Sequence, residues 1–123
     1  MAGFSIAARI KSVTHALAGI ATMLRTQHNA WVHLAATLAA VLLAVWFSVS
    51  AGEWIALVLA IVIVWSAEAL NTAFELLCDV ASPEFHPLVK QAKDVAAAAV
   101  LVAAIGAITV GLLVFGPRLL ALL

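Results

Sequence analysis

Four polar residues recur within an otherwise apolar stretch of the sequence, at a spacing that fits one face of a helix. Glu68, Asn71 and Glu75 are separated by three and four residues, and Asp79 continues the row one turn later. Because an α-helix turns once in 3.6 residues, this spacing predicts that the side chains share a face. Carboxylate oxygens are the ligands that hard divalent cations prefer, so the row indicates an acidic site with Mg²⁺ as the default cation.

The apolar surroundings restrict where these acids can lie. An Asp at the centre of a membrane helix costs about 2.5–3.5 kcal/mol, and we take Glu as similar. The eight Leu, Ile and Val residues of 55–64 return about 2.4–4.8 kcal/mol in total, at about 0.3–0.6 kcal/mol each. Glu68 and Glu75 must therefore lie near the membrane boundary, face protein or bind a cation. The alternative is that they only form hydrogen bonds between helices.

The composition predicts the kind of scaffold that holds this row. Hydrophobic residues make up 67% of the chain and charged residues 10%, whereas a soluble domain is nearer half apolar and a quarter charged. Spans of roughly 20 residues cross a bilayer as helices. We expect a single all-α membrane domain, 1–123, with transmembrane helices at 30–50, 54–77 and 95–115. The acidic and basic residues balance, and no nucleic-acid partner is expected.

An amphipathic helix is expected before the first span, over residues 5–26. Its apolar residues recur at alternating spacings of four and three, and basic residues lie off that stripe. Such a helix next to a membrane span is typical of one that lies in the headgroup layer. The alternative is a soluble helix packed against a partner. The stripe consists of Ile6, Ile10, Val13, Leu17, Ile20 and Leu24.

The polar stretch 81–94 is expected to be the loop between the second and third spans. Ser82-Pro83 and His86-Pro87 are expected to break helix there, and Gly116-Pro117 to end the third span. Five of the six Lys and Arg residues lie before the first span or in this loop, and Arg118 alone follows the third span. The positive-inside rule therefore places the N-terminus and the 81–94 loop in the cytoplasm.

A second charged cluster, Lys90, Lys93 and Asp94, lies at the start of the third span. A lysine beside an aspartate there could contact phosphate and metal, or could be a cation that extends toward water from a helix start. The four histidines lack the i, i+4 spacing of a helical zinc site, and no GxxxxGK loop occurs. The residues alone therefore indicate a cytoplasm-facing acidic site with a nearby lysine.

The run Glu68-Ala69-Leu70-Asn71-Thr72-Ala73-Phe74-Glu75, followed by Asp79 and then Ala92-Lys93-Asp94, resembles the motif of the prokaryotic diacylglycerol kinase and undecaprenol kinase family. The resemblance implies a homotrimeric kinase of the bacterial inner membrane that moves the γ-phosphate of ATP to a lipid hydroxyl with Mg²⁺. The segment 82–87 resembles the undecaprenol kinase branch. On the third span, small residues at spacings of three and four would allow close helix contact in a trimer: Ala96, Ala99, Ala103, Ala107 and Gly111.

The resemblance also implies roles for the motif residues. Glu68 matches the family's general base, which takes the proton of the lipid hydroxyl, and Glu75 matches a Mg²⁺ ligand near the ATP phosphates. The position of a second metal-binding glutamate of the family is occupied here by Gln27, whose amide oxygen can bind a cation but carries no charge. The role of the motif acid Asp79 is open. The residues expected around the nucleotide are Asn71, Glu75, Lys93 and Asp94.

Two other functions are compatible with the same residues. A small ion or proton conduit would use Glu68 and Glu75 as relay groups, but it would not need Lys93 at the mouth of the site. A catalytically impaired relative is the other, since Gln27 lacks the charge that the family's metal site usually has. The sequence leaves open whether undecaprenol or diacylglycerol is the lipid.

Overall fold

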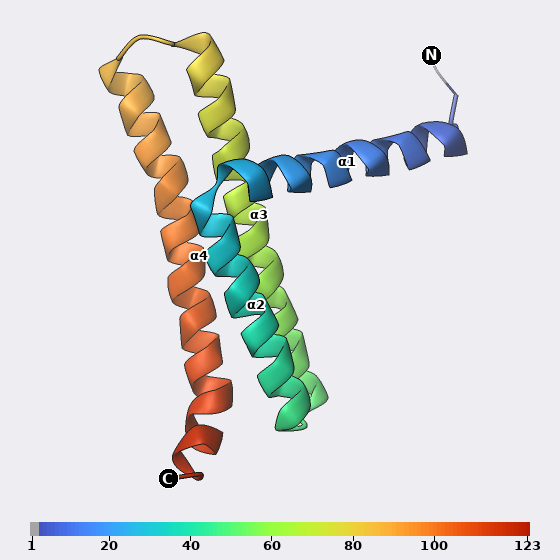
Figure 1. Cartoon of the computed structure of the whole chain (residues 1–123), viewed down its shortest axis with the longest axis vertical. Helices are drawn as coiled ribbons and strands as arrows, with labels where there is room; N and C mark the ends of the chain where they lie inside the picture. Colours follow the sequence, from blue (N-terminus) through green and yellow to red (C-terminus); the bar gives the residue numbers. More distant parts are fainter. Residues whose placement is uncertain (1–2) are drawn as a thin grey trace.

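The computed structural model describes residues 3–123, which form four helices joined by short connections (Figure 1). The helices are α1 (Ile6–Thr26), α2 (His28–Trp46), α3 (Ala51–Ala81) and α4 (Pro87–Leu120). All regular structure in the described residues is α-helical, which confirms the predicted fold class. By length and composition, α2, α3 and α4 can each cross a membrane, in agreement with the three expected spans.

Helix α1 projects sideways from the bundle formed by the other three helices (Figure 1). It begins at Ser5, whose Oγ accepts a hydrogen bond from the Ala8 N–H at 3.4 Å. Its apolar side chains are exposed along most of its length, and Met23 near its end is the residue that is buried. Only the last turns of α1 thus pack against the bundle, which leaves the remaining apolar face available for the headgroup layer.

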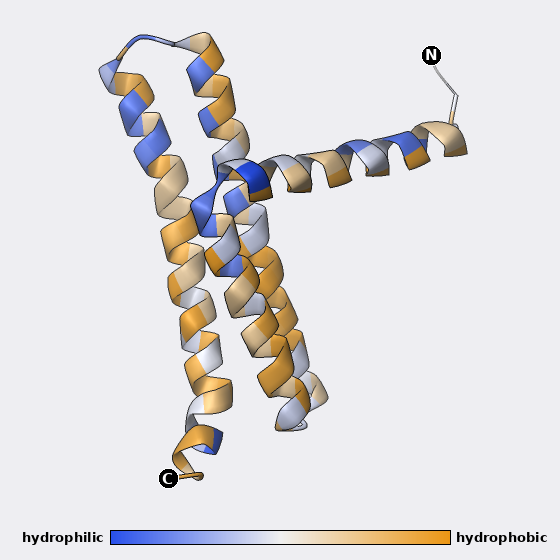
Figure 2. Cartoon of the chain, in the orientation of Figure 1, coloured by the Kyte–Doolittle hydropathy of each residue, from blue (hydrophilic) through white to orange (hydrophobic). Residues whose placement is uncertain are grey.

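The lengths of the helices show which part of the bundle extends beyond a membrane. Helix α2, with 19 residues, is about 28 Å long, close to the hydrocarbon thickness of about 30 Å. Helices α3 and α4, with 31 and 34 residues, are about 46 and 51 Å long. Hydrophilic residues gather in the last turns of α3 and the first turns of α4 (Figure 2). These turns therefore form the part that projects from the bilayer.

The connection between α3 and α4 is shorter than the loop expected at 81–94. Helix α3 continues to Ala81 and α4 begins at Pro87, so only 82–86 is non-helical. Pro87 starts the helix instead of breaking it, because the first helical position needs no N–H and proline already has a helical φ. His86 caps the helix, with its Nδ1 accepting from the Leu88 N–H at 3.2 Å.

The third span also extends further than expected. Helix α4 passes through Gly116 and Pro117 and ends at Leu120, so the prediction that this pair stops the helix is wrong. The Arg118 guanidinium binds the Val114 carbonyl oxygen at 2.6 Å and the Glu53 carboxylate at 2.8 and 2.9 Å. These bonds hold the last turn of α4 against the start of α3.

The turn between α2 and α3 lies at the far end of the bundle from the polar turns. Ser48 has a left-handed backbone with φ of 50°, and its N–H bonds to the Val45 carbonyl while the Val49 N–H bonds to the Ala44 carbonyl. This is the Schellman pattern that satisfies the last carbonyl groups of a helix. Five buried side chains form a core beside the turn: Ala44, Val49, Leu57, Val114 and Phe115.

Helix α3 starts with a reciprocal cap at the same end of the bundle. Ser50 Oγ accepts from the Glu53 N–H at 3.2 Å, and Glu53 Oε2 accepts from the Ser50 N–H at 2.8 Å. This capping box satisfies two backbone donors that the first turn would otherwise leave unpaired. Glu53 therefore serves both the cap and the pair with Arg118.

Candidate functional site

Three polar residues in the second half of α3 are buried, namely Glu68, Asn71 and Thr72. Glu68 is 0% exposed and Asn71 6%. The Thr72 hydroxyl donates to the Glu68 backbone carbonyl at 2.8 Å, which satisfies Thr72 within its own helix. In contrast, Glu68 Oε1 and Asn71 Oδ1 have no hydrogen-bond partner among the described residues. Such atoms are uncommon in folded proteins because each lacks the partner that water gave it.

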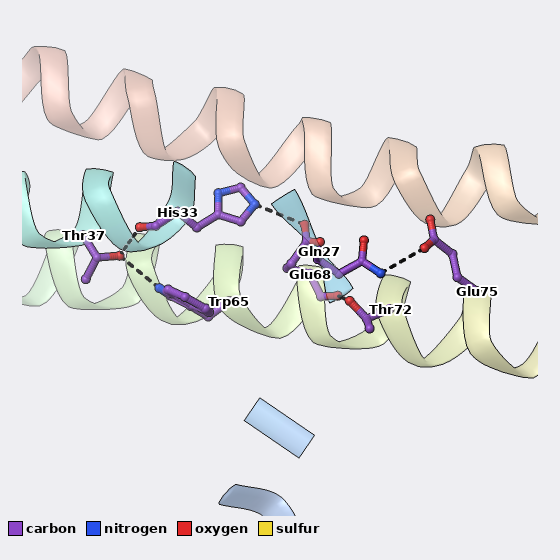
Figure 3. A network of polar contacts seen from close by, with 7 residues as sticks. All are labelled: Gln27, His33, Thr37, Trp65, Glu68, Thr72 and Glu75. Atoms are coloured by element: carbon purple, nitrogen blue, oxygen red, sulfur yellow. Dashed lines mark hydrogen bonds and ion pairs between the residues drawn. The ribbon is translucent and has the colours of Figure 1, made fainter. Parts of the chain in front are cut away.

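The second carboxylate oxygen of Glu68 is bound by a histidine from the first span. His33 Nε2 lies 3.1 Å from Glu68 Oε2, and the histidine side chain is 11% exposed (Figure 3). His33 also lines an apolar groove of about 440 Å³ between α2, α3 and α4. The contact ties α2 to α3 at the depth of the buried carboxylate.

Glu75 meets the joint between α1 and α2. Gln27 lies in this joint with an extended backbone, and its Nε2 donates to Glu75 Oε2 at 3.2 Å (Figure 3). The two residues expected to share a metal are thus adjacent, although they are 48 positions apart in the sequence.

The charged residues at the start of α4 form two separate ion pairs. Lys93 Nζ reaches across to Asp79 Oδ1 on α3 at 2.6 Å, whereas Asp94 Oδ2 is bound by Lys90 Nζ of its own helix at 2.6 Å. The adjacent residues Lys93 and Asp94 therefore have different partners. Asp79, for which the sequence predicted no role, is the residue that holds Lys93.

Asn71 faces a different neighbour from the two glutamates. It lines a hollow of about 390 Å³ between α3 and α4, with Ser66, Phe74, Ala96 and Ala99 among the other lining residues. The row expected on one face of the helix therefore spreads over adjacent parts of its surface. Glu68 and Glu75 meet α2 and the α1–α2 joint, and Asn71 is directed toward α4.

Sequence reasoning did not identify His33, Thr37 or Trp65 as part of this network. The Trp65 indole N–H donates to Thr37 Oγ1 at 2.9 Å, and the Thr37 hydroxyl donates to the His33 carbonyl at 2.7 Å (Figure 3). His33 lacks the i, i+4 spacing to another histidine that a helical metal site would have. The available signal was its position inside a span without charged residues, because an ionisable side chain there usually has a functional partner.

Comparison with known proteins gives the same indication as the motif. The family model of prokaryotic diacylglycerol kinase matches residues 14–115. The undecaprenol kinase of Bacillus subtilis (strain 168) is 41% identical over 109 residues, which are 89% of each chain.

Two further relatives are longer than the matched region. The diacylglycerol kinase of Synechocystis (strain ATCC 27184 / PCC 6803 / Kazusa) is 37% identical over 113 residues, 91% of this chain and 65% of the relative. That of Escherichia coli (strain K12) is 40% identical over 73 residues, 59% of this chain and 60% of the relative. Because the family model covers most of the sequence, the chain belongs to the prokaryotic diacylglycerol kinase family of membrane lipid kinases.

Proposed function

We propose that this chain transfers the γ-phosphate of ATP to the hydroxyl group of undecaprenol or diacylglycerol at the cytoplasmic boundary of the bacterial inner membrane. The observation that carries the proposal is Glu68, a fully buried carboxylate with one oxygen bound by His33 and the other without a partner. An unpaired buried oxygen destabilises the fold, so its presence favours a functional role. The family membership favours a kinase over an ion or proton conduit.

Glu68 acts in this proposal as the general base. The hydroxyl oxygen of the lipid attacks the γ-phosphorus, and its proton passes to a carboxylate oxygen of Glu68. The bond from the γ-phosphorus to the bridging oxygen breaks, and that electron pair leaves with ADP. From Glu68, α3 continues for about 20 Å to Ala81, into the polar turns. This depth suits a lipid that approaches within the bilayer and a nucleotide that approaches from water.

The nucleotide is proposed to bind at the polar turns of α3 and α4. Lys93 would neutralise charge on the transferred phosphoryl group, the usual requirement of this chemistry. Its exposed pair with Asp79 can be exchanged for a phosphate oxygen, since both groups are accessible to water. Asn71 and Asp94 complete the proposed nucleotide contacts, and Asn71 contributes a side-chain oxygen without a partner among the described residues.

The proposed Mg²⁺ ligands are Glu75 and Gln27. Among the described residues, no three His, Cys, Asp or Glu side chains converge as a preformed metal cage. A cation shared with ATP does not need one, because Mg²⁺ is usually held by one or two carboxylates together with substrate phosphates. If the Gln27 amide is turned by half a turn, its oxygen replaces the nitrogen 3.2 Å from Glu75 Oε2, which gives two oxygen ligands. When bound there, Mg²⁺ would neutralise charge on the ATP phosphates.

The proposed assembly is a homotrimer whose sites combine residues from neighbouring chains. Large apolar side chains are exposed along α2, α3 and α4 and can face either lipid or further copies. The small-residue row of α4 supports the second possibility, because small side chains let helix backbones approach closely. The proposed orientation places the N-terminus and the 82–86 connection in the cytoplasm, as the distribution of Lys and Arg predicts.

A lipid phosphorylation assay tests the proposal. The purified chain in detergent–lipid micelles is incubated with radiolabelled MgATP and either undecaprenol or diacylglycerol, and the phosphorylated lipid is measured. We expect product from at least one lipid. The lipid that is phosphorylated faster would indicate whether the chain acts as an undecaprenol kinase or as a diacylglycerol kinase. A matched control is Glu84→Gln, which changes an exposed acid of the 82–86 connection and should leave turnover unchanged. Absence of product from both lipids in a folded preparation would refute the proposal.

A further inference from the structure

The side-chain carboxylate of Glu68 contacts an imidazole ring from another helix. His33 Nε2 is 3.1 Å from Glu68 Oε2, and both side chains are largely shielded from solvent. In the described part of the chain, His33 is the one basic side chain that pairs with this carboxylate. A general base must be ionised to act, and an ionised carboxylate oxygen only accepts hydrogen bonds, so in the proposed active state the proton in this contact belongs to Nε2 of the histidine.

The imidazole ring is held in place by further contacts on its own side of the site. The Thr37 hydroxyl donates to the His33 carbonyl at 2.7 Å and accepts from the Trp65 indole N–H at 2.9 Å. The Trp65 ring also lies edge-on to the imidazole, with centroids 6.2 Å apart and planes at 68°. Trp65 precedes Glu68 by three residues on α3, so the same helix face orients both partners of the contact (Figure 3).

We propose that His33 is a positioning residue for Glu68. Its Nε2–H occupies Oε2, so Oε1 is the oxygen that receives the proton from the lipid hydroxyl. This inference rests on the proposed function, in which Glu68 is the base. The different surroundings of the two carboxylate oxygens of Glu68 support it, because Oε2 has a partner and Oε1 has none among the described residues.

The arrangement also provides an acceptor for the proton that leaves the lipid hydroxyl during the reaction. The hydroxyl proton moves to Oε1 while the lipid oxygen forms its bond to phosphorus, and the His33 proton stays on Nε2. No change of histidine tautomer is needed, and the bond to Oε2 keeps the carboxylate from rotating away. A bond between helices that served stability alone would not require a second, unpaired oxygen in the interior.

The kinetic test compares two substitutions at position 33. His33→Leu removes the donor, whereas His33→Gln keeps an amide N–H that can reach the carboxylate. We expect His33→Leu to lower kcat at least about tenfold, which is a part of the roughly 10²–10⁴-fold contribution of a general base. The KM for ATP should stay unchanged, because the nucleotide contacts are elsewhere. His33→Gln should recover most of kcat, and His15→Leu on the exposed part of α1 is the matched control.

Nuclear magnetic resonance of the histidine ring nitrogens tests the same contact without using activity. In the unmodified chain, His33 should carry its proton on Nε2, and Glu68→Gln should shift that nitrogen signal while Glu84→Gln leaves it in place. This result can be read whether or not His33→Leu folds. A His33 ring protonated only at Nδ1 would refute the proposed contact. An Nε2 signal that does not shift in Glu68→Gln would also refute it.

The two proposals fail in different ways. If no lipid is phosphorylated, the kinase proposal fails while the ring signals still report on the contact. If Glu68→Gln inactivates the enzyme but both His33 variants keep full kcat, only the positioning role is refuted. Equal losses of kcat in His33→Leu and His33→Gln would also refute it, because the retained donor would then have no effect.

Discussion

Two regions of the bundle, the α2–α3 turn and the middle of α3, arrange their polar groups in opposite ways. Around the α2–α3 turn, Glu53 caps α3 and binds Arg118, and the neighbouring core is apolar. At the level of the α1–α2 joint, Glu68 and Asn71 are buried more deeply, yet each has an oxygen without a partner among the described residues. The region around the α2–α3 turn is arranged for stability. The middle of α3 keeps acceptors available, as expected where substrates supply the missing partners.

The first prediction concerns Asn71 in the middle of α3. Asn71→Leu removes an unpaired buried oxygen, a group whose burial costs about 1–3 kcal/mol, and the hollow beside it leaves room for the larger side chain. We expect the thermal unfolding midpoint in micelles to rise. Kinase turnover should fall on the order of 100-fold, the scale of removing one hydrogen-bonding side chain from a catalytic site.

An unchanged turnover for Asn71→Leu would exclude Asn71 from the site. A lower unfolding midpoint would show that its amide contributes to stability more than the structure indicates. Glu84→Gln, on the exposed connection, serves as the control for handling and reconstitution.

The second prediction concerns the affinity of the proposed site for Mg²⁺ and uses the substitution Gln27→Glu. The change places a second carboxylate beside Glu75, where an amide now donates at 3.2 Å. A full charge within about 4 Å of a cation is worth about 4 kcal/mol at an effective dielectric of 20, before desolvation. We expect the Mg²⁺ concentration for half-maximal turnover to fall roughly tenfold or more.

The Gln27→Glu variant should also be less stable without Mg²⁺, since two adjacent carboxylates repel. Titration of turnover with Mg²⁺, and unfolding with and without a chelator, measure both effects. An unchanged Mg²⁺ requirement would argue against Gln27 as a ligand. A large rise in maximal turnover would instead indicate that the natural chain is an impaired relative.

The smallest effect is expected at the α2–α3 turn. Ser48 has a φ of 50°, a conformation that glycine adopts without strain. Ser48→Gly should therefore stabilise the Schellman turn by about 0.5–1 kcal/mol, with turnover unchanged. Chemical unfolding in mixed micelles measures the change. Ser12→Gly, in the interior of α1, is a control that should have the opposite effect and lower the stability. A loss of stability at position 48 would contradict the account of this turn.

Much of this architecture follows from local sequence features. The apolar runs predict three spans, and the spacing of Glu68, Asn71 and Glu75 predicts where polar groups meet the bundle. The predictions at His86-Pro87 and Gly116-Pro117 are wrong, because Pro87 occupies the first position of α4, where no N–H is needed, and α4 continues through Pro117 to Leu120. His86 caps the start of α4, and the pair of Arg118 with Glu53 holds its last turn against α3.

The pairings within the site depend on tertiary contacts that spacing does not reveal. His33 and Glu68 are 35 positions apart, and Gln27 and Glu75 are 48 apart. Their meeting depends on how α2 crosses α3 and on the direction of the α1–α2 joint. The adjacency of Lys93 and Asp94 in the sequence suggested a shared role, but a helix directs successive side chains about 100° apart, and the two find different partners.

The buried acid Glu68 serves chemistry, whereas Glu53 beside the α2–α3 turn serves stability. Glu68→Gln and Glu53→Gln, measured side by side for lipid kinase turnover and thermal unfolding, test this difference most directly. We predict that Glu68→Gln loses at least about 100-fold in turnover and remains folded and able to bind ATP. Glu53→Gln should keep its turnover and unfold at a lower temperature. Near-normal turnover in Glu68→Gln would contradict the account.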